Sequence, residues 1–202
     1  MGDTISYYEE HASEFARDTL HLDLSRFHSA FLSLISDGGR ILDLGCGTGR
    51  DSRVFSEMGF SVTAMDGSEA MCMIAGKTAG IPVINSDFES FVSDVLFDGI
   101  WASASLLHVD REHLPHIFRR YGAMLRKGGV FYSSFRYGSF SGNIGGRHYT
   151  YLDEESFAGI IAQSGLFSIK EIAVTPDLRP GREKELWLNA FMIADQPSSS
   201  MQ

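Results

Sequence analysis

Residues 41–52 decide the fold and read Ile41-Leu42-Asp43-Leu44-Gly45-Cys46-Gly47-Thr48-Gly49-Arg50-Asp51-Ser52. A short apolar run leads into three glycines at alternate positions, and a helix-like segment follows. Glycine allows left-handed backbone angles and the close approach of a ligand, while the first turn of a helix presents unpaired amide groups. This stretch therefore predicts a buried strand, a ligand-binding turn and a helix.

The alternation of strand and helix continues toward the carboxyl terminus. We expect strands at residues 40–44, 61–65, 81–85, 97–102, 130–135, 167–174 and 185–194. We expect helices at residues 50–58, 68–78, 88–95, 111–126 and 153–164. Strands that alternate with helices pair in parallel and carry helices on both faces, whereas the last two strands, with no helix between them, are expected to be antiparallel neighbours. The pattern predicts a doubly wound α/β fold.

The chain length and its ends suggest one domain with a helical cap. A chain of 202 residues, 44% of them hydrophobic, can bury one core. Apolar residues at helical spacing predict a cap over residues 1–36, ahead of a core at 40–195. We therefore expect a single domain over 1–196, with a disordered tail at 197–202.

Charge and cysteine content exclude several classes of partner. The net charge of -9 argues against nucleic-acid binding. No apolar run reaches the roughly 18 residues of a membrane span, so we expect no membrane partner and a cytoplasmic location. Cys46 and Cys72 provide neither a disulfide framework nor a metal quartet. The oligomeric state is left open between monomer and homodimer.

The spacing of the glycines separates two classes of cofactor. A dinucleotide loop has the pattern G-x-G-x-x-G, but here the last position falls on Arg50 and the loop is G-x-G-x-G instead. Asp66 follows 21 residues after Gly45 (66 minus 45), at the end of the second expected strand, where a ribose diol would lie. The pattern favours S-adenosylmethionine (SAM) over NAD.

From Tyr8 to Ala194 the chain resembles the class I SAM-dependent methyltransferases. The matching segments are Asp43 to Gly49, Asp66 to Met71, Ser86 to Phe88, Phe97 to Ala102 and Leu125 to Val130. Within that family it is similar to the small bacterial tellurite-resistance and quinone-type methyltransferases. The resemblance implies a Rossmann-like, mostly parallel seven-stranded sheet with an antiparallel last strand, and SAM as cofactor with S-adenosylhomocysteine as product.

The resemblance also assigns roles to single positions. It implies that Asp43 and the glycine loop hold the methionine portion, that Asp66 holds the ribose, and that the later residues surround the adenine. The expected cofactor residues are Asp43, Gly45, Cys46, Gly47, Gly49, Asp66, Gly67, Met71, Asp87, Phe88 and Ala102. Two of them have simpler explanations, because Met71 also suits a core position and Asp87 also suits a helix cap.

One histidine is a candidate general base. His108 follows the fourth expected strand, at the edge where parallel sheets bind ligands, and its side chain ordinarily titrates near neutrality. A lone histidine ahead of a helix is also often structural. His113 and His116 indicate a solvated helix face, and we expect no metal site.

The acceptor is expected to be a small molecule, and an anionic one. The stretch Ala102-Ser103-Ala104-Ser105 lacks the Asn-Pro-Pro-Tyr type of motif common in family members that methylate amino groups of nucleic acid or glutamine. Arginine side chains suit carboxylates and oxyanions. The expected substrate residues are Tyr8, Arg136, Arg147, Tyr149 and Arg179, with Tyr8 on an amino-terminal helix that closes over the cofactor. The alternative is that these arginines pair with acids such as Asp177 and Glu183.

These observations favour SAM-dependent methyl transfer to a small molecule. A nicotinamide oxidoreductase on the same type of fold is disfavoured by the glycine spacing. A second alternative is a SAM-binding sensor or partner subunit without catalysis, because methyl transfer needs few dedicated side chains.

Overall fold

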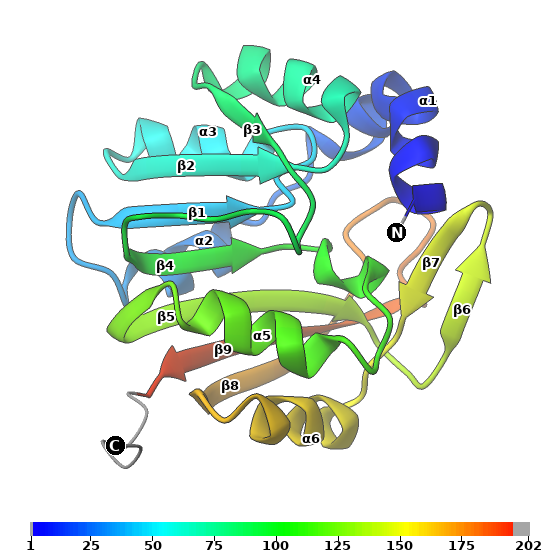
Figure 1. The fold of residues 1–202 in the computed structure, drawn as a ribbon. Coiled ribbons are helices and arrows are strands. Elements are labelled where there is room, and N and C mark those ends of the chain that lie inside the picture. The colour runs from blue at the N-terminus through cyan, green and yellow to red at the C-terminus, as the bar shows by residue number, and fades with distance from the viewer. Residues whose placement is uncertain (1, 196–202) are drawn as a thin grey trace.

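The computed structural model describes residues 2–195, so the tail expected at 197–202 lies outside the described residues. Figure 1 shows a central sheet with helices on both faces. The helices are α1 (Gly2–Thr19), α2 (Ser25–Leu32), α3 (Arg50–Glu57), α4 (Glu69–Ala79), η1 (Leu106–His108), α5 (Leu114–Gly122) and α6 (Glu154–Ser164). The strands are β1 (Arg40–Leu44), β2 (Ser61–Asp66), β3 (Val83–Asn85), β4 (Phe97–Ala102), β5 (Leu125–Arg136), β6 (Ser141–Ile144), β7 (Arg147–Thr150), β8 (Phe167–Pro176) and β9 (Leu186–Ala194). Within residues 2–195 no helix combines the length and apolarity needed to cross a membrane.

The main sheet has seven strands in the order β3-β2-β1-β4-β5-β9-β8. The first five strands of this order pair in parallel, whereas β9 is antiparallel to both β5 and β8. It follows that β8 runs in the same direction as β5. The order reverses between β1 and β4, and ligands of open α/β sheets bind beyond the strand ends at such a point. The fold class expected from the sequence is confirmed.

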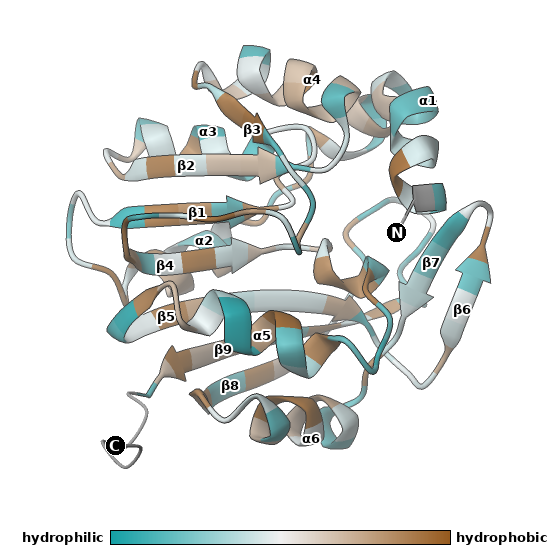
Figure 2. Cartoon of the chain, viewed as in Figure 1, coloured by the Kyte–Doolittle hydropathy of each residue, from teal (hydrophilic) through white to brown (hydrophobic). Residues whose placement is uncertain are grey.

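Two clusters of buried apolar side chains hold the helices against the sheet. Figure 2 colours the apolar residues of the strands and helices brown. On one face Phe31 of α2 and Phe55 of α3 pack around Trp101, which stacks on Tyr132 with ring centroids 3.9 Å apart. A β-carbon at Gly99 would lie 2.6 Å from the Phe31 ring, so only glycine lets α2 approach β4 this closely. The other face is covered by α5 and α6. The central strands β1, β4 and β5 are thereby buried on both sides, as parallel strands require, whereas the edge strands β3 and β8 are largely exposed.

Three local expectations were wrong or incomplete. The helix expected at 88–95 is absent, because the Asp87 carboxylate accepts from Glu89 and Ser90 amides and fixes a turn there instead. The helix expected at 111–126 is confined to α5. The sequence analysis also missed the β6–β7 hairpin, whose polar strands and glycine turn lack an apolar alternation. In Figure 1 this hairpin and α1 project from the same edge of the sheet.

Candidate functional site

A cavity lies at this edge, and residues from both halves of the sheet line it. Nine of the predicted cofactor residues line it: Asp43, Gly45, Cys46, Gly47, Asp66, Gly67, Met71, Asp87 and Phe88. The predicted base and all the predicted substrate residues line the same cavity: His108, Tyr8, Arg136, Arg147, Tyr149 and Arg179. The fold therefore brings together two groups of residues that the sequence analysis assigned separately.

The glycine loop forms a cradle of exposed backbone. Gly45 and Gly47 have φ angles of 73° and 54°, in the region where glycine is favoured. A β-carbon at Gly45 would lie 2.5 Å from the Ser105 β-carbon, whereas one at Gly47 would contact only Phe15, at 3.9 Å. Gly45 thus permits close packing of the loop, and Gly47 leaves its backbone open to the cavity.

Asp66 is tied directly to this loop. One of its carboxylate oxygens accepts from the Gly47 amide at 2.9 Å and the other from the Ser68 amide at 3.0 Å. Burial raises the pKa of this carboxyl. A carboxylate has about four lone-pair directions, so two backbone contacts leave capacity for further donors such as the hydroxyls of a ribose.

Two predicted cofactor residues are not part of the cavity lining. Gly49 precedes α3 with φ of 76°, and a β-carbon there would lie 2.8 Å from the Ala75 backbone, so this glycine serves the packing of α3 on α4. Ala102 is fully buried at the end of β4, within the apolar core. Asp87 lines the cavity but also caps the turn that follows it, the alternative that the sequence left open.

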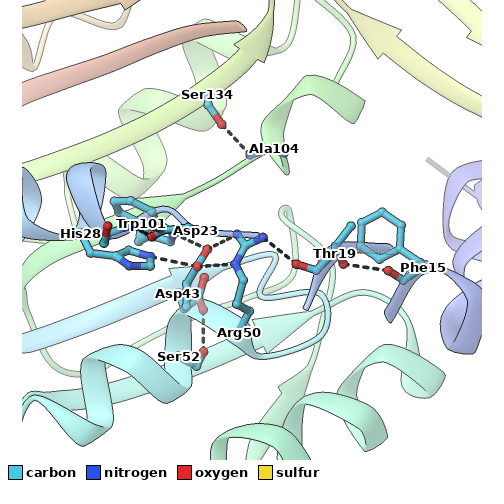
Figure 3. A network of polar contacts seen from close by, with 12 residues as sticks. Phe15, Thr19, Asp23, His28, Asp43, Arg50, Ser52, Trp101, Ala104 and Ser134 are labelled. Atoms are coloured by element: carbon cyan, nitrogen blue, oxygen red, sulfur yellow. Dashed lines mark hydrogen bonds and ion pairs between the residues drawn. The ribbon is translucent and has the colours of Figure 1, made fainter. Parts of the chain in front are cut away.

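A polar network next to the glycine loop connects α1, α2, α3 and β4 (Figure 3). Asp51 accepts from Arg50, from Trp101 Nε1 at 2.8 Å and from His28 at 3.0 Å. Arg50 also donates to the Thr19 carbonyl at 3.2 Å, which joins the end of α1 to the start of α3. Although burial opposes ionisation, Arg50 and His28 hold the pKa of Asp51 well below its usual range. Sequence reasoning missed this network, because its members lie far apart in the chain.

Ser134 lines the cavity although the sequence did not indicate it, and it contacts Ala104 in the segment that follows β4. Both line the cavity, and Ser134 Oγ accepts from the Ala104 amide at 2.8 Å (Figure 3). Ala104 has φ of 51°, a costly angle for a residue with a β-carbon. The Ser134 contact fixes this backbone where the chain leaves β4.

The predicted substrate arginines differ in their partners. Arg136 pairs with Glu185, and Arg179 pairs with Asp177, which also accepts from Trp187 Nε1 at 2.9 Å. For these two arginines the simpler explanation, internal pairing with acids, is what the geometry supports. Arg136 and Arg179 thus form part of the cavity wall, and the carboxylates of Glu185 and Asp177 neutralise their charges.

The surroundings of Arg147 differ from those of Arg136 and Arg179. Its guanidinium lies over the rings of Tyr7, Tyr149 and Tyr8, at 4.2, 5.3 and 5.8 Å from the centroids. Within residues 2–195 it forms no ion pair with a carboxylate, and its buried Nε has no hydrogen-bond partner. Buried polar groups are ordinarily paired, so an orphaned guanidinium nitrogen at a cavity wall indicates a ligand position.

His108 is buried and has both ring nitrogens engaged. Its Nδ1 lies 2.6 Å from the His148 carbonyl oxygen, and its Nε2 lies 2.9 Å from the Tyr8 hydroxyl. Burial lowers the pKa of His108 to about 4, against the opposing effect of the His148 carbonyl. By contrast, His113 and His116 are exposed on the side of α5, as expected.

The sequence comparisons agree with this geometry. A family model described as a methyltransferase domain matches residues 41–129. The malonyl-[acyl-carrier protein] O-methyltransferase of Salmonella typhimurium is 33% identical over 138 residues, which cover 64% of this chain and 49% of that protein. The enzyme of the same name from Buchnera aphidicola is 38% identical over 68 residues, covering 33% and 28%. The chain thus spans about half or less of these curated relatives.

Solved structures share the fold. A 1,6-didemethyltoxoflavin-N1-methyltransferase from Burkholderia thailandensis, bound to S-adenosylhomocysteine, has a TM-score of 0.75 at 20% identity, covering 95% of this chain and 85% of that one. The structure described as a DhpI–SAH complex has a TM-score of 0.72 at 20% identity and covers 97% of both chains. Residues 41–129 thus match a methyltransferase domain, and the chain has the fold of the solved SAM-dependent methyltransferases.

The lining of the cavity suits a ligand of the SAM type. The open backbone at Gly47 leaves room beside the loop, and Asp66 presents a buried carboxylate next to it. Met71 and Phe88 add apolar lining for an aromatic base. These features match a ligand that combines a charged amino-acid portion, a diol and a purine.

Proposed function

We propose that this chain transfers the methyl group of SAM to a small-molecule acceptor that carries an anionic group. The observation that carries the proposal is the position of Arg147, whose buried Nε has no hydrogen-bond partner among the described residues and which lines the same cavity as the glycine loop and Asp66. Arginine binds carboxylates and related oxyanions through two parallel hydrogen bonds. An acceptor held there would lie in the cavity that also receives the cofactor.

The chain's own residues would contribute by placement. When bound, SAM supplies an electrophilic methyl group, and the predicted cofactor residues Asp43, Gly47 and Asp66 would hold it. Arg147 would bind the acceptor, since bringing two reactants together in one orientation can lower a barrier by several kcal/mol. The helix α1 and the β6–β7 hairpin would exclude water, because Thr4 of α1 accepts from the His148 amide at 3.0 Å and joins the two.

The names of the curated relatives support a carboxylate acceptor. Their stated substrate is a malonyl group on a carrier protein, and a malonyl thioester ends in a free carboxylate. This chain covers only half or less of those proteins, so the proposal takes from them the chemical class of the acceptor and not the carrier protein. A cytoplasmic location and the absence of a nucleic-acid partner stay predictions from the sequence.

Binding and turnover measurements test the proposal. Calorimetry should show that SAM and S-adenosylhomocysteine bind and that NAD does not. A malonyl thioester should then be methylated at least tenfold faster than its methyl ester. Arg147→Gln should remove that preference, whereas Arg182→Gln should keep it, because Arg182 lies outside the cavity and is half exposed.

Two results would contradict the proposal. Equal rates with the acid and its ester in the unmodified protein would mean that Arg147 does not select an anion. Tight SAM binding without turnover of any acceptor would favour the alternative of a sensor or partner subunit.

A further inference from the structure

We infer that the ionised oxygen of the acceptor is itself the methylated atom, and that Tyr8 and His108 act as a positioning pair rather than as a general base. This inference rests on the proposed function, since it concerns the acceptor that Arg147 would hold. It narrows the substrate class to acids that are already ionised at neutral pH. It also reverses the role that the sequence suggested for His108.

The hydrogen bonds around His108 determine where its proton lies. A carbonyl oxygen only accepts, so Nδ1 of His108 must carry the proton that it shares with His148. In the neutral ring Nε2 is then bare and accepts from the Tyr8 hydroxyl. The one proton of Tyr8 is thus directed at His108, and the Arg147 guanidinium lies 5.8 Å from the centroid of the Tyr8 ring.

This arrangement leaves no basic nitrogen open to the acceptor. Nε2 is covered by the Tyr8 hydroxyl, and Nδ1 is covered by the hairpin backbone. A proton from the acceptor would have to enter through Tyr8 and convert His108 into a buried imidazolium. Arg147 already places a positive charge beside it, and both burial and that charge oppose a second one.

The charged and titratable groups around the pair come from α1, β2, β7 and the loop after η1, and the Tyr7 ring of α1 lies 5.6 Å from the Tyr8 ring. From β7, Arg147, His148 and Tyr149 face it; from β2, Asp66 faces Tyr8. The His148 ring in turn lies 3.1 Å from an Asp110 carboxylate oxygen. Burial raises the pKa of Tyr8 to about 12, with Arg147 opposing part of that rise, so the hydroxyl keeps its proton across the neutral range.

Methyl transfer to an oxyanion balances without a base. The acceptor oxygen supplies the electron pair of the new C–O bond, and the pair of the broken C–S bond stays on sulfur. The sulfonium charge and the oxyanion charge cancel, and no proton is released. A neutral phenol would instead release one proton per turnover, and both ring nitrogens of His108, the predicted base, are already engaged. The geometry therefore points to a carboxylate or a comparable oxyanion as the methylated group.

Histidine NMR tests the proton arrangement in the intact protein. Nitrogen-15 spectra from pH 5 to 8.5 should show His108, assigned with His108→Gln, as the neutral ring protonated on Nδ1 throughout. Titration of this ring near pH 6.5, or protonation on Nε2 instead, would overturn the inference. This readout needs neither cofactor nor acceptor.

Kinetics test the chemical consequence. The variant His108→Gln offers an oxygen to Tyr8 but no base, so turnover of a malonyl thioester should fall by less than tenfold, with a rate independent of pH between 6 and 8.5. A general base would instead be worth about 10²- to 10⁴-fold. Tyr8→Phe should raise KM more than it lowers kcat, because it removes a contact of Arg147 without removing the guanidinium.

The Arg147 and His108 variants distinguish this inference from the proposed function. In weakly buffered solution, turnover of the malonyl thioester should release no proton. If Arg147→Gln abolishes the preference for acids but His108→Gln loses 100-fold or more, the proposed function stands and the inference fails. If Arg147→Gln has no effect, the proposed function fails first, and the NMR spectra still decide the role of His108.

Discussion

The Gly47 amide donates to the Asp66 carboxylate over 2.9 Å, across 19 residues of sequence. This bond joins the end of β2 to the loop that follows β1, the two positions that the sequence separately linked to one cofactor. A carboxylate placed this way orients the loop and still presents lone pairs to the cavity. Substitutions at either residue should therefore act on SAM binding.

The variant Gly47→Ala should weaken SAM binding by at least tenfold. Its β-carbon would meet no protein atom closer than 3.9 Å, so the added methyl group would occupy the cavity. Gly59→Ala is a matched control, because Gly59 also has a positive φ, of 88°, with nothing within 4 Å, yet does not line the cavity. Both variants should lose roughly 1–2 kcal/mol of folding free energy from backbone strain. Equal SAM affinities in calorimetry would place the cofactor elsewhere.

The variant Asp66→Asn should bind SAM about 10- to 100-fold more weakly, since a charge-assisted hydrogen bond contributes roughly 1.5–3 kcal/mol. Asparagine keeps one oxygen for a backbone amide, so the fold should persist. A melting temperature close to that of the unmodified protein is the control. Unchanged affinity in a folded variant would contradict the ribose assignment.

The sequence predicted those parts of the site that depend on local geometry. The glycine loop and Asp66 were found because a strand, a tight turn and a helix leave a short-range pattern. The sequence did not predict the partners of the arginines. The Arg136–Glu185 ion pair, for example, spans 49 residues and forms only when β9 lies beside β5. The β6–β7 hairpin was missed for a related reason: its contacts with α1 stabilise strands that have no apolar alternation of their own.

Glu9 should hold the helix α1 against the first turn of α4. Its carboxylate accepts from the amides of Glu69 and Ala70, at 2.5 and 3.2 Å, in the first turn of α4, where a negative charge is favoured. The variant Glu9→Gln should lose roughly 0.3–1 kcal/mol of this contact and speed hydrogen exchange in α1 and the dissociation of SAM. Glu10→Gln, one residue further and also exposed, is the control. If the two variants behave alike, α1 is held by its apolar contacts instead.

The stability of the fold should depend on pH through Asp43. Burial, together with the nearby Asp51, raises the pKa of the Asp43 carboxyl, while Ser52 at 2.5 Å opposes part of the rise. An unfolded aspartate ionises near pH 3.9. Between that value and the raised folded pKa, the folded state holds a proton that the unfolded state has lost, so stability falls as pH rises, by about 1.4 kcal/mol per pH unit.

The variant Asp43→Asn should remove this dependence. Denaturant unfolding between pH 5 and 8 should show the unmodified protein losing stability with rising pH, and Asp43→Asn losing markedly less. Asp37→Asn, at an exposed position ahead of β1, should follow the unmodified protein. At acidic pH the unmodified protein and both variants should lose stability in a similar way. The pKa of Asp51 is lowered in the folded state, so its ionised carboxylate contributes stability that is lost as the pH falls. Parallel curves for Asp43→Asn and the unmodified protein would mean that Asp43 ionises in the folded state as readily as in the unfolded chain.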